Sequence, residues 1–225
     1  MKSKFSLIID FDSTIISLET LECLAEIALF KNKNKNEIID KISDYTKLAM
    51  NGDITFEESL DYRFNLIELS KHHIDKTIDL LKSKIDDSFI SNIDFFSKHQ
   101  NDIYIVSGGF YSIIDSVLLS ETGIKWNIFA NNLIFNDFDK VLGVDKKNPL
   151  SYSMGKVKLI QSLNLNNDII MVGDGYTDYE VKKFNVANYF LAYTRHIQRD
   201  NVISKADFNC ENFNQVIDFL EKNYS

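Results

Sequence analysis

The sequence predicts an α/β protein with a Rossmann-like three-layer parallel sheet core, a small inserted all-helical domain and a β-hairpin excursion. Two observations lead to this fold class. Short apolar runs at residues 5–10, 103–106 and 168–172 are separated by segments of helical periodicity, an alternation that indicates a parallel sheet covered on both faces. Between the first two runs, residues 17–81 show helical periodicity alone.

We therefore expect two domains: a core formed by residues 1–16 and 82–225, and a helical domain formed by residues 17–81. A chain of 225 residues is long enough for one core and a smaller insert. Because the chain starts at its first expected strand, we expect no N-terminal regulatory domain.

Composition narrows the classes of partner and compartment. The net charge of -8 argues against nucleic acid as the main partner, since binding to a phosphate backbone requires a basic surface. No apolar run approaches the roughly 20 residues that cross a bilayer. Cys23 and Cys210 follow no metal-ligand spacing, so we expect two reduced thiols. These features predict a soluble, cytoplasmic protein without a membrane partner. They are compatible with a small phosphorylated ligand.

Four helices are expected after the first strand. Apolar residues recur at helical spacing in four segments, at about residues 20–29, 38–49, 55–67 and 74–85. Gly52 should end the second helix, and Thr55 with Glu58 forms a capping box for the third. The run of alternating lysine and asparagine at residues 31–36 is expected to be a solvated loop.

Strands and helices alternate again in the second half of the chain. Irregular alternation around asparagine-containing turns predicts one or two β-hairpins at residues 126–144. The other expected elements are a helix at 111–118, a helix that begins near Gly155, a strand at 189–192 and a closing helix at 213–220.

Polar residues directly follow each of the three apolar strands. They are the pair Asp10 and Asp12, then Ser107 with two glycines, then Asp174 between two glycines. Ligands of open parallel sheets bind outside the carboxyl ends of the strands, so these groups should meet in one pocket if the strands are neighbours. Residues two apart in an extended chain face the same side, which places Asp10 and Asp12 together. Lys156, at the start of a later helix, should join them.

This set of side chains fits the binding and transfer of a phosphoryl group. The carboxylates Asp10 and Asp174 suit Mg²⁺, a hard cation that prefers oxygen ligands. Ser107, the Gly108 N–H at the expected start of a helix, and Lys156 suit a phosphate. A carboxylate beside that phosphate can attack phosphorus, while a second carboxylate protonates the leaving oxygen and later activates water.

Each piece also has a plainer interpretation. The segment around Asp174 lacks the third glycine of a dinucleotide fingerprint, and no EF-hand loop follows Asp10. Ser107 alone could cap a helix, and Lys156 alone could be a solvated lysine. Asp178 could cap a helix or support a metal from its outer shell. The shared position at strand ends favours the site.

The motifs resemble those of the haloacid dehalogenase superfamily of phosphohydrolases over nearly the whole chain. The four motifs occur in order as Asp10-Phe11-Asp12-Ser13-Thr14, Ser107, Lys156 and Gly173-Asp174-Gly175-Tyr176-Thr177-Asp178. The resemblance implies that Asp10 is the nucleophile and Asp12 the general acid and base. It implies Mg²⁺ held by Asp10, the Asp12 backbone carbonyl and Asp174, with Asp178 in support. Ser107, Gly108 and Lys156 would hold the phosphoryl group.

The helical segment contains Met50-Asn51-Gly52 and then Phe56-Glu57-Glu58-Ser59-Leu60 and Arg63, and in these residues it resembles the cap of phosphoserine phosphatases. This likeness implies that Glu19 binds the substrate ammonium, that Arg63 grips its carboxylate, and that Met50, Phe56 and Thr177 complete the substrate pocket. Glu19 and Arg63 could instead pair with each other, and Met50 and Phe56 could be packing residues between helices. Two departures concern specificity: Thr177 stands where many bacterial relatives have Asn, and Tyr176 replaces a smaller residue.

The expected function is Mg²⁺-dependent hydrolysis of O-phospho-L-serine through an aspartyl-phosphate, a step of serine biosynthesis. One alternative keeps the chemistry but changes the substrate to phosphohomoserine or a phosphorylated amino-alcohol. A second is transfer of the phosphoryl group to an acceptor other than water. A third, from a different class, is a non-catalytic module that binds a phosphorylated ligand.

Overall fold

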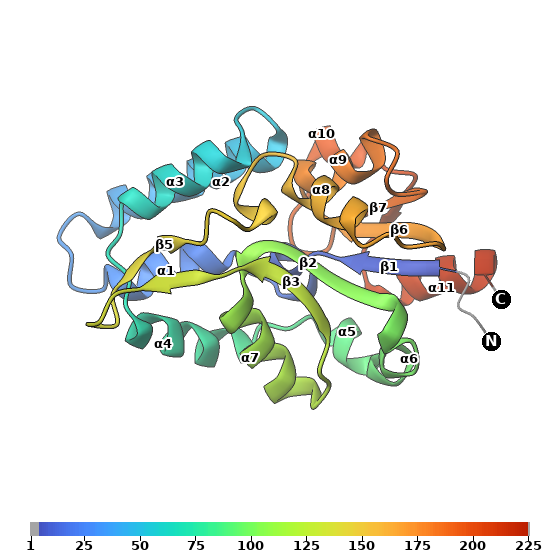
Figure 1. Cartoon of the computed structure of the whole chain (residues 1–225), viewed down its shortest axis with the longest axis horizontal. Coiled ribbons are helices and arrows are strands. Elements are labelled where there is room, and N and C mark those ends of the chain that lie inside the picture. The colour runs from blue at the N-terminus through green and yellow to red at the C-terminus, as the bar shows by residue number, and fades with distance from the viewer. Residues whose placement is uncertain (1–4, 225) are drawn as a thin grey trace.

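A six-stranded parallel sheet forms the centre of the molecule, in the order β3-β2-β1-β6-β7-β8 (Figure 1). The computed structural model describes residues 5–224. The expected α/β sheet fold is confirmed, and the three strands followed by polar residues are indeed neighbours at its centre. The strands are β1 (Phe5–Ile9), β2 (Ile103–Phe110), β3 (Asn127–Asn131), β6 (Asp168–Gly173), β7 (Tyr189–Tyr193) and β8 (Phe208–Cys210).

Helices cover both faces of this sheet, which is why every residue of β1 is buried (Figure 1). Successive strand residues point to opposite faces, so Ile8 and Met171 belong to one apolar cluster while Leu7 and Ile170 belong to the other. The larger cluster packs beneath α5 (Asp87–Ser91), α6 (Ile93–Lys98), α7 (Tyr111–Thr122) and α11 (Phe213–Tyr224), and the smaller beneath α8 (Gly155–Ser162), α9 (Tyr176–Lys183) and α10 (Asp200–Ile203).

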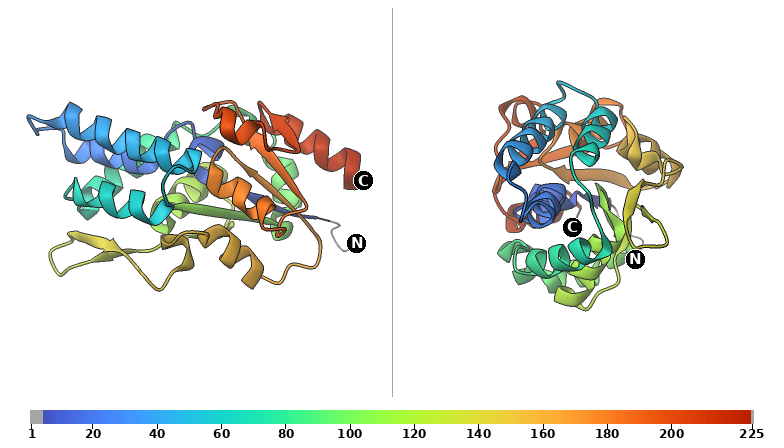
Figure 2. Two further views of the ribbon diagram at one scale, coloured as in Figure 1. Left: turned by 90° about the horizontal axis from the view of Figure 1, so that it is seen from above. Right: turned by 90° about the vertical axis from the view of Figure 1, so that its left-hand side faces the viewer.

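Four of the helices between β1 and β2 in the chain, α1–α4, extend from the carboxyl end of the sheet (Figures 1 and 2). Gly52 ends the second in a left-handed conformation, and the capping box of Thr55 and Glu58 is present in the third, both as expected. The second helix begins at Lys35, so the expected loop at residues 31–36 is too long by two residues. The helices are α1 (Thr20–Ala28), α2 (Lys35–Asn51), α3 (Phe56–Asn65) and α4 (Lys71–Lys82).

The segment expected to be hairpins divides into two parts. Its first strand, β3, joins the main sheet by parallel pairing with β2, and the Asn127 side chain adds hydrogen bonds to the carbonyls of Gln100 and Ile103 at the sheet edge. Only the later part forms an antiparallel hairpin, of β4 (Leu133–Phe135) and β5 (Val141–Val144). The expectation of hairpins over 126–144 was therefore wrong for the first strand.

Both cysteines are buried free thiols. Among residues 5–224, the helices are too short or too polar to cross a bilayer.

Candidate active site

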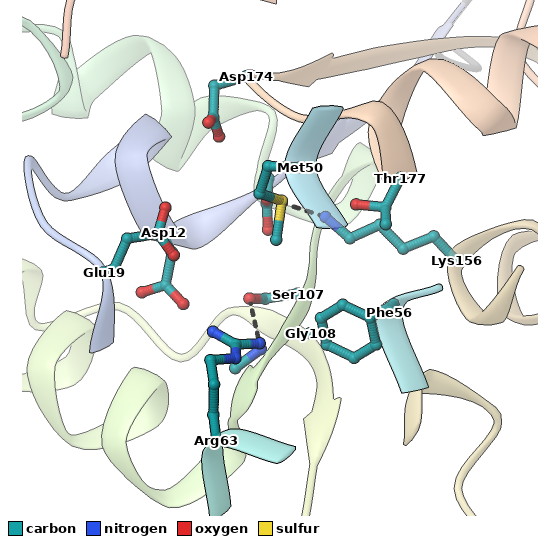
Figure 3. Close-up of a pocket in the computed structure, with 12 residues that line it drawn as sticks. Asp12, Glu19, Met50, Phe56, Arg63, Ser107, Gly108, Lys156, Asp174 and Thr177 are labelled. Carbon is teal, nitrogen blue, oxygen red and sulfur yellow. Dashed lines mark hydrogen bonds and ion pairs between the residues drawn. The ribbon is translucent and has the colours of Figure 1, made fainter. Parts of the chain in front are cut away.

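A pocket lies where β1, β2 and β6 end and the helical segment α1–α4 faces the sheet (Figure 3). Every site residue proposed from the sequence lines this pocket except Asp178, which is fully buried directly behind it, 2.6 Å from the Lys156 ammonium. The lining residues are Asp10, Asp12, Glu19, Met50, Phe56, Arg63, Ser107, Gly108, Gly109, Lys156, Asp174 and Thr177.

Asp10 sits at the first position after β1 and is fixed from both sides. Its backbone N–H donates to the Val172 carbonyl at 2.9 Å, and its Oδ1 accepts from the Phe11 N–H at 2.7 Å. The chain then turns tightly through Phe11–Ile15, where Ser13 adopts a left-handed conformation with φ of 53°. This turn brings the Asp12 side chain back to the same pocket.

Asp12 is held by the start of α1. Its Oδ1 accepts hydrogen bonds from the Thr20 backbone N–H, at 3.1 Å, and from the Thr20 hydroxyl. Burial raises the pKa of Asp12 well above its usual value, and the neighbouring charges of Glu19 and Asp10 raise it further. A carboxyl group with a raised pKa retains its proton more readily, as a general acid requires.

Lys156 lies between two buried carboxylates. Its ammonium is 2.9 Å from Asp10 Oδ2 and 2.6 Å from Asp178 Oδ1. Asp178 also accepts from the Gly175 N–H at 3.0 Å, so it fixes the turn between β6 and α9. The positions of the lysine nitrogen and of the Asp174 turn are thus linked through one carboxylate.

Asp174 pairs with an arginine that the sequence interpretation missed. Arg199 places its Nε and Nη2 each 3.1 Å from Asp174 Oδ2, and its Nη2 lies 3.6 Å from Glu19 Oε1. Burial raises the pKa of Asp174, while the Arg199 charge acts in the opposite direction. Arg199 lies in the irregular chain between β7, which ends at Tyr193, and α10, so a rule that considers the residues directly after a strand does not reach it.

The region around Ser107 differs in one respect from the expectation. The strand β2 continues to Phe110 and α7 begins at Tyr111, so the expected position of the Gly108 N–H at a helix start was wrong. Ser107 Oγ accepts from the Gly109 N–H at 2.9 Å and therefore stabilises a strand end rather than a helix cap. The Gly108 carbonyl is held by the Asn131 amide at 2.9 Å.

Arg63 approaches the same region from α3, and its guanidinium lies near Ser107 in Figure 3. Its Nε donates to the Ser59 carbonyl at 3.2 Å and its Nη1 to Thr46 Oγ1 at 3.0 Å. The side chain is almost fully buried, and the burial lowers its pKa.

Glu19 takes partners other than Arg63. Its Oε1 accepts from Ser13 Oγ at 2.7 Å and lies beside Arg199. Within residues 5–224 no ion pair joins Glu19 directly to Arg63, although the Glu19 charge acts to raise the pKa of Arg63. Both the Glu19 and the Arg63 side chains line the pocket.

The carboxylates near Lys156 form a donor set that fits a divalent cation. Oxygens of Asp10, Asp174 and Asp178 all lie within 4.8 Å of one another and all three residues are buried. Hard oxygen donors are the ligands that Mg²⁺ prefers. The site residues therefore fit Mg²⁺.

Comparison with known proteins places this geometry among hydrolases. Residues 6–181 match the family described as haloacid dehalogenase-like hydrolase. The chain is 32% identical over 216 residues to the chloroplastic phosphoserine phosphatase of Arabidopsis thaliana, covering 94% of this chain and 70% of that protein. It is 28% identical to the phosphoserine phosphatase of Homo sapiens, covering 95% of this chain and 92% of the human protein.

The chain is also similar to solved structures of phosphoserine phosphatases and related proteins. A phosphoserine phosphohydrolase-like protein from Francisella tularensis superposes with a TM-score of 0.85 at 28% identity, covering 96% of this chain and 99% of that chain. A phosphoserine phosphatase described as a phospho-aspartyl intermediate analogue superposes with a TM-score of 0.76 at 25% identity, covering 97% and 99%.

Proposed function

The chain belongs to the haloacid dehalogenase-like hydrolase family, and from that premise we propose that it is a Mg²⁺-dependent phosphatase of O-phospho-L-serine. The observation that carries this proposal is the single pocket in which Asp10, Asp12 and Lys156 meet Glu19 and Arg63. The first three supply groups for phosphoryl transfer. The other two supply an anion and a cation for a substrate that carries both charges.

In the first step, a carboxylate oxygen of Asp10 forms a bond to phosphorus while the bond from phosphorus to the serine oxygen breaks. Asp12 gives its proton to that leaving oxygen, and its raised pKa supports this role. Ser107, the Gly108 N–H and Lys156 hold the phosphoryl oxygens. These groups act mainly by alignment and charge stabilisation, as is usual in phosphoryl transfer.

In the second step, a water oxygen bonds to phosphorus, its proton passes to Asp12, and the bond between Asp10 and phosphorus breaks. This returns both carboxyl groups to their starting states. Asp10, the Asp12 backbone carbonyl and Asp174 would hold Mg²⁺, with Asp178 in support, and the ion neutralises charge on the phosphoryl oxygens when bound.

The substrate specificity that we propose comes from the helical side of the pocket. The planar guanidinium of Arg63 can donate hydrogen bonds to the substrate carboxylate, and the Glu19 carboxylate can accept them from the substrate ammonium group. Met50, Phe56 and Thr177 line the remaining wall and exclude water. Because Glu19 also lies beside Arg199, its negative charge is stabilised in a buried site.

We propose that residues 17–81 act as a cap domain on a core of residues 1–16 and 82–225. The two connections between them lie side by side, with Ile16 and Ile85 in an antiparallel bridge and the Ser17 N–H bonded to the Lys84 carbonyl at 2.9 Å. Such a paired connection can act as a hinge for opening.

The two buried free thiols suit a reducing compartment, and we propose the cytoplasm.

Phosphate release from a panel of small phosphomonoesters, with and without Mg²⁺, tests the proposal. We expect phosphoserine to have the highest kcat/KM and Asp10→Asn to abolish turnover while leaving the fold intact. A higher kcat/KM for phosphohomoserine or a phosphorylated amino-alcohol would identify that compound as the preferred substrate and would leave the proposed reaction unchanged. A folded protein that releases phosphate from none of them would leave only a ligand-binding module, and a new phosphoester formed with added serine would indicate phosphotransfer.

A further inference from the structure

Three large side chains cross the boundary between α1–α4 and the sheet core, and each packs against a glycine on the other side. A Cβ on Gly108 would lie 2.5 Å from Phe56 Cζ, and one on Gly175 would lie 2.7 Å from Met50 Sδ. In both pairs the helical segment supplies the large residue. The third pair runs in the opposite direction, with Tyr176 from the core packed on Gly52.

The Tyr176 ring covers the α-carbon of Gly52 so closely that no side chain fits between them. A Cβ there would lie 2.7 Å from Tyr176 Cγ and 2.8 Å from both Cδ atoms. Gly52 also has φ of +83°, because it ends α2 in the left-handed conformation. Glycine is therefore required at this position for two independent reasons, the backbone conformation and the ring.

The ring is held in place from its own side of the boundary. Lys183 donates to the Tyr176 hydroxyl at 2.8 Å, and the Tyr179 ring packs beside it with centroids 5.8 Å apart. Both partners belong to α9. Tyr176 thus projects from a fixed platform in the core toward the end of α2.

The contact lies at a groove next to the active-site pocket. This groove is lined by residues of both sides, among them Gly52, Phe56, Tyr176 and Thr177, and it shares Phe56 and Thr177 with the pocket. Met50, two residues before Gly52, lines the pocket beside Lys156 and Thr177 (Figure 3). A contact that fixes the end of α2 therefore also fixes Met50.

We propose that Tyr176 is a positioning residue that holds the end of α2, and through it Met50, closed over the active site. It acts by ring packing on Gly52 and takes no part in the chemistry. The packing stands on the geometry alone, whereas its kinetic consequence rests on the proposed phosphatase function.

The kinetic test compares Tyr176→Ala with the conservative Tyr176→Phe, which keeps the ring. A smaller closed population weakens apparent substrate binding without changing the closed complex, so Tyr176→Ala should raise KM about tenfold and leave kcat within about twofold. Tyr176→Phe should keep the KM of the parent chain. A loss of kcat equal to the change in KM, or a Phe variant as impaired as the Ala variant, overturns the proposal.

Hydrogen exchange on the full chain without substrate tests the packing independently of activity. Amides of residues 49–56 should exchange about tenfold faster in Tyr176→Ala and at the parent rate in Tyr176→Phe. If no phosphomonoester is hydrolysed, the proposed function fails but this measurement still decides the contact. Unchanged exchange in Tyr176→Ala overturns the contact even if the enzyme is active.

The glycine side of the contact has a matched control. Gly123 ends α7 with φ of +67° and has open space where its Cβ would be, so Gly123→Ala adds backbone strain without a clash. Gly52→Ala should raise KM and speed exchange at 49–56, whereas Gly123→Ala should do neither. In the Tyr176→Ala background, Gly52→Ala should increase KM and the exchange rate by clearly less than it does in the parent chain, because the ring that it would clash with is absent. Independent effects of the two substitutions would contradict the proposal.

Discussion

Lys156 places its ammonium nitrogen 2.9 Å from Asp10 Oδ2, and both side chains are almost completely buried. Burial lowers the pKa of Lys156, but the two carboxylates of Asp10 and Asp178 outweigh it and raise the pKa above its usual value. The lysine is therefore a permanent cation beside the proposed nucleophile. It offsets negative charge where a bound phosphoryl group would add more.

Replacing Lys156 should cost both stability and activity. Lys156→Ala leaves Asp10 and Asp178 buried without their cation, which should lower the free energy of unfolding by about 3–5 kcal/mol. Loss of one charge-stabilising donor should lower kcat by about 10²–10³ in the fraction that folds. Urea unfolding and phosphate release measure the two effects. Lys158→Ala, at an exposed position in the same helix, is the control and should resemble the parent chain. Equal behaviour of the two variants would contradict the proposed role of Lys156.

Arg63 should decide substrate selectivity rather than general reactivity. Arg63→Ala removes the proposed carboxylate partner, so kcat/KM for phosphoserine should fall about 100-fold, as expected for a lost charge-assisted pair. Hydrolysis of an aryl phosphate, which has no carboxylate, should change little. Comparison of the two substrates on each variant measures this difference.

The control for Arg63 removes one of its two internal hydrogen-bond partners while keeping the guanidinium. Thr46→Val deletes the hydroxyl that accepts from Arg63 Nη1, and it should leave the ratio of the two substrates unchanged. Equal losses on both substrates in Arg63→Ala would show that the arginine only supports packing of α2 and α3, and the zwitterion pocket would be refuted.

The centre of the site was predictable from the sequence because it depends on one local rule. Asp10, Ser107 and Asp174 each follow an apolar run, and the carboxyl ends of neighbouring parallel strands share an edge of the sheet. Helical periodicity likewise located α1–α4, since an amphipathic face repeats within a few residues.

Other parts of the site depend on packing between distant segments. Arg199 lies in the irregular chain after β7, and only the folded structure brings it to Asp174 and Glu19. The strand β3 pairs with β2, and Asn127 bonds to carbonyls 24 and 27 residues earlier, so the local alternation that predicts a hairpin does not reveal these partners. The contact of Tyr176 with Gly52 is of the same kind.

Mg²⁺ should stabilise the folded chain through the carboxylate cluster. A cation that binds only the native state at about 100 times its Kd adds about 2.7 kcal/mol to the free energy of unfolding. We expect Tm to rise with added Mg²⁺ and to return after chelation, and Asp174→Asn to abolish most of the rise. Asp218→Asn, exposed on α11, removes the same charge far from the cluster and should keep the response. If added Mg²⁺ does not change the Tm of the parent chain, the result would argue against the cation site.

Asp86 should make stability depend on acid pH. Burial raises its pKa, but hydrogen bonds from His196, Ser88 and Tyr193 outweigh this and bring the pKa below its usual value. A depressed pKa means that the stabilisation is complete above the unfolded-state pKa and is lost as pH falls toward the folded value. Asp86→Asn should therefore lower the free energy of unfolding by about 1–3 kcal/mol near neutral pH, and this difference should shrink below about pH 4. Denaturant unfolding at several pH values measures it, with exposed Asp87→Asn as control; a difference that grows in acid would disprove the assignment.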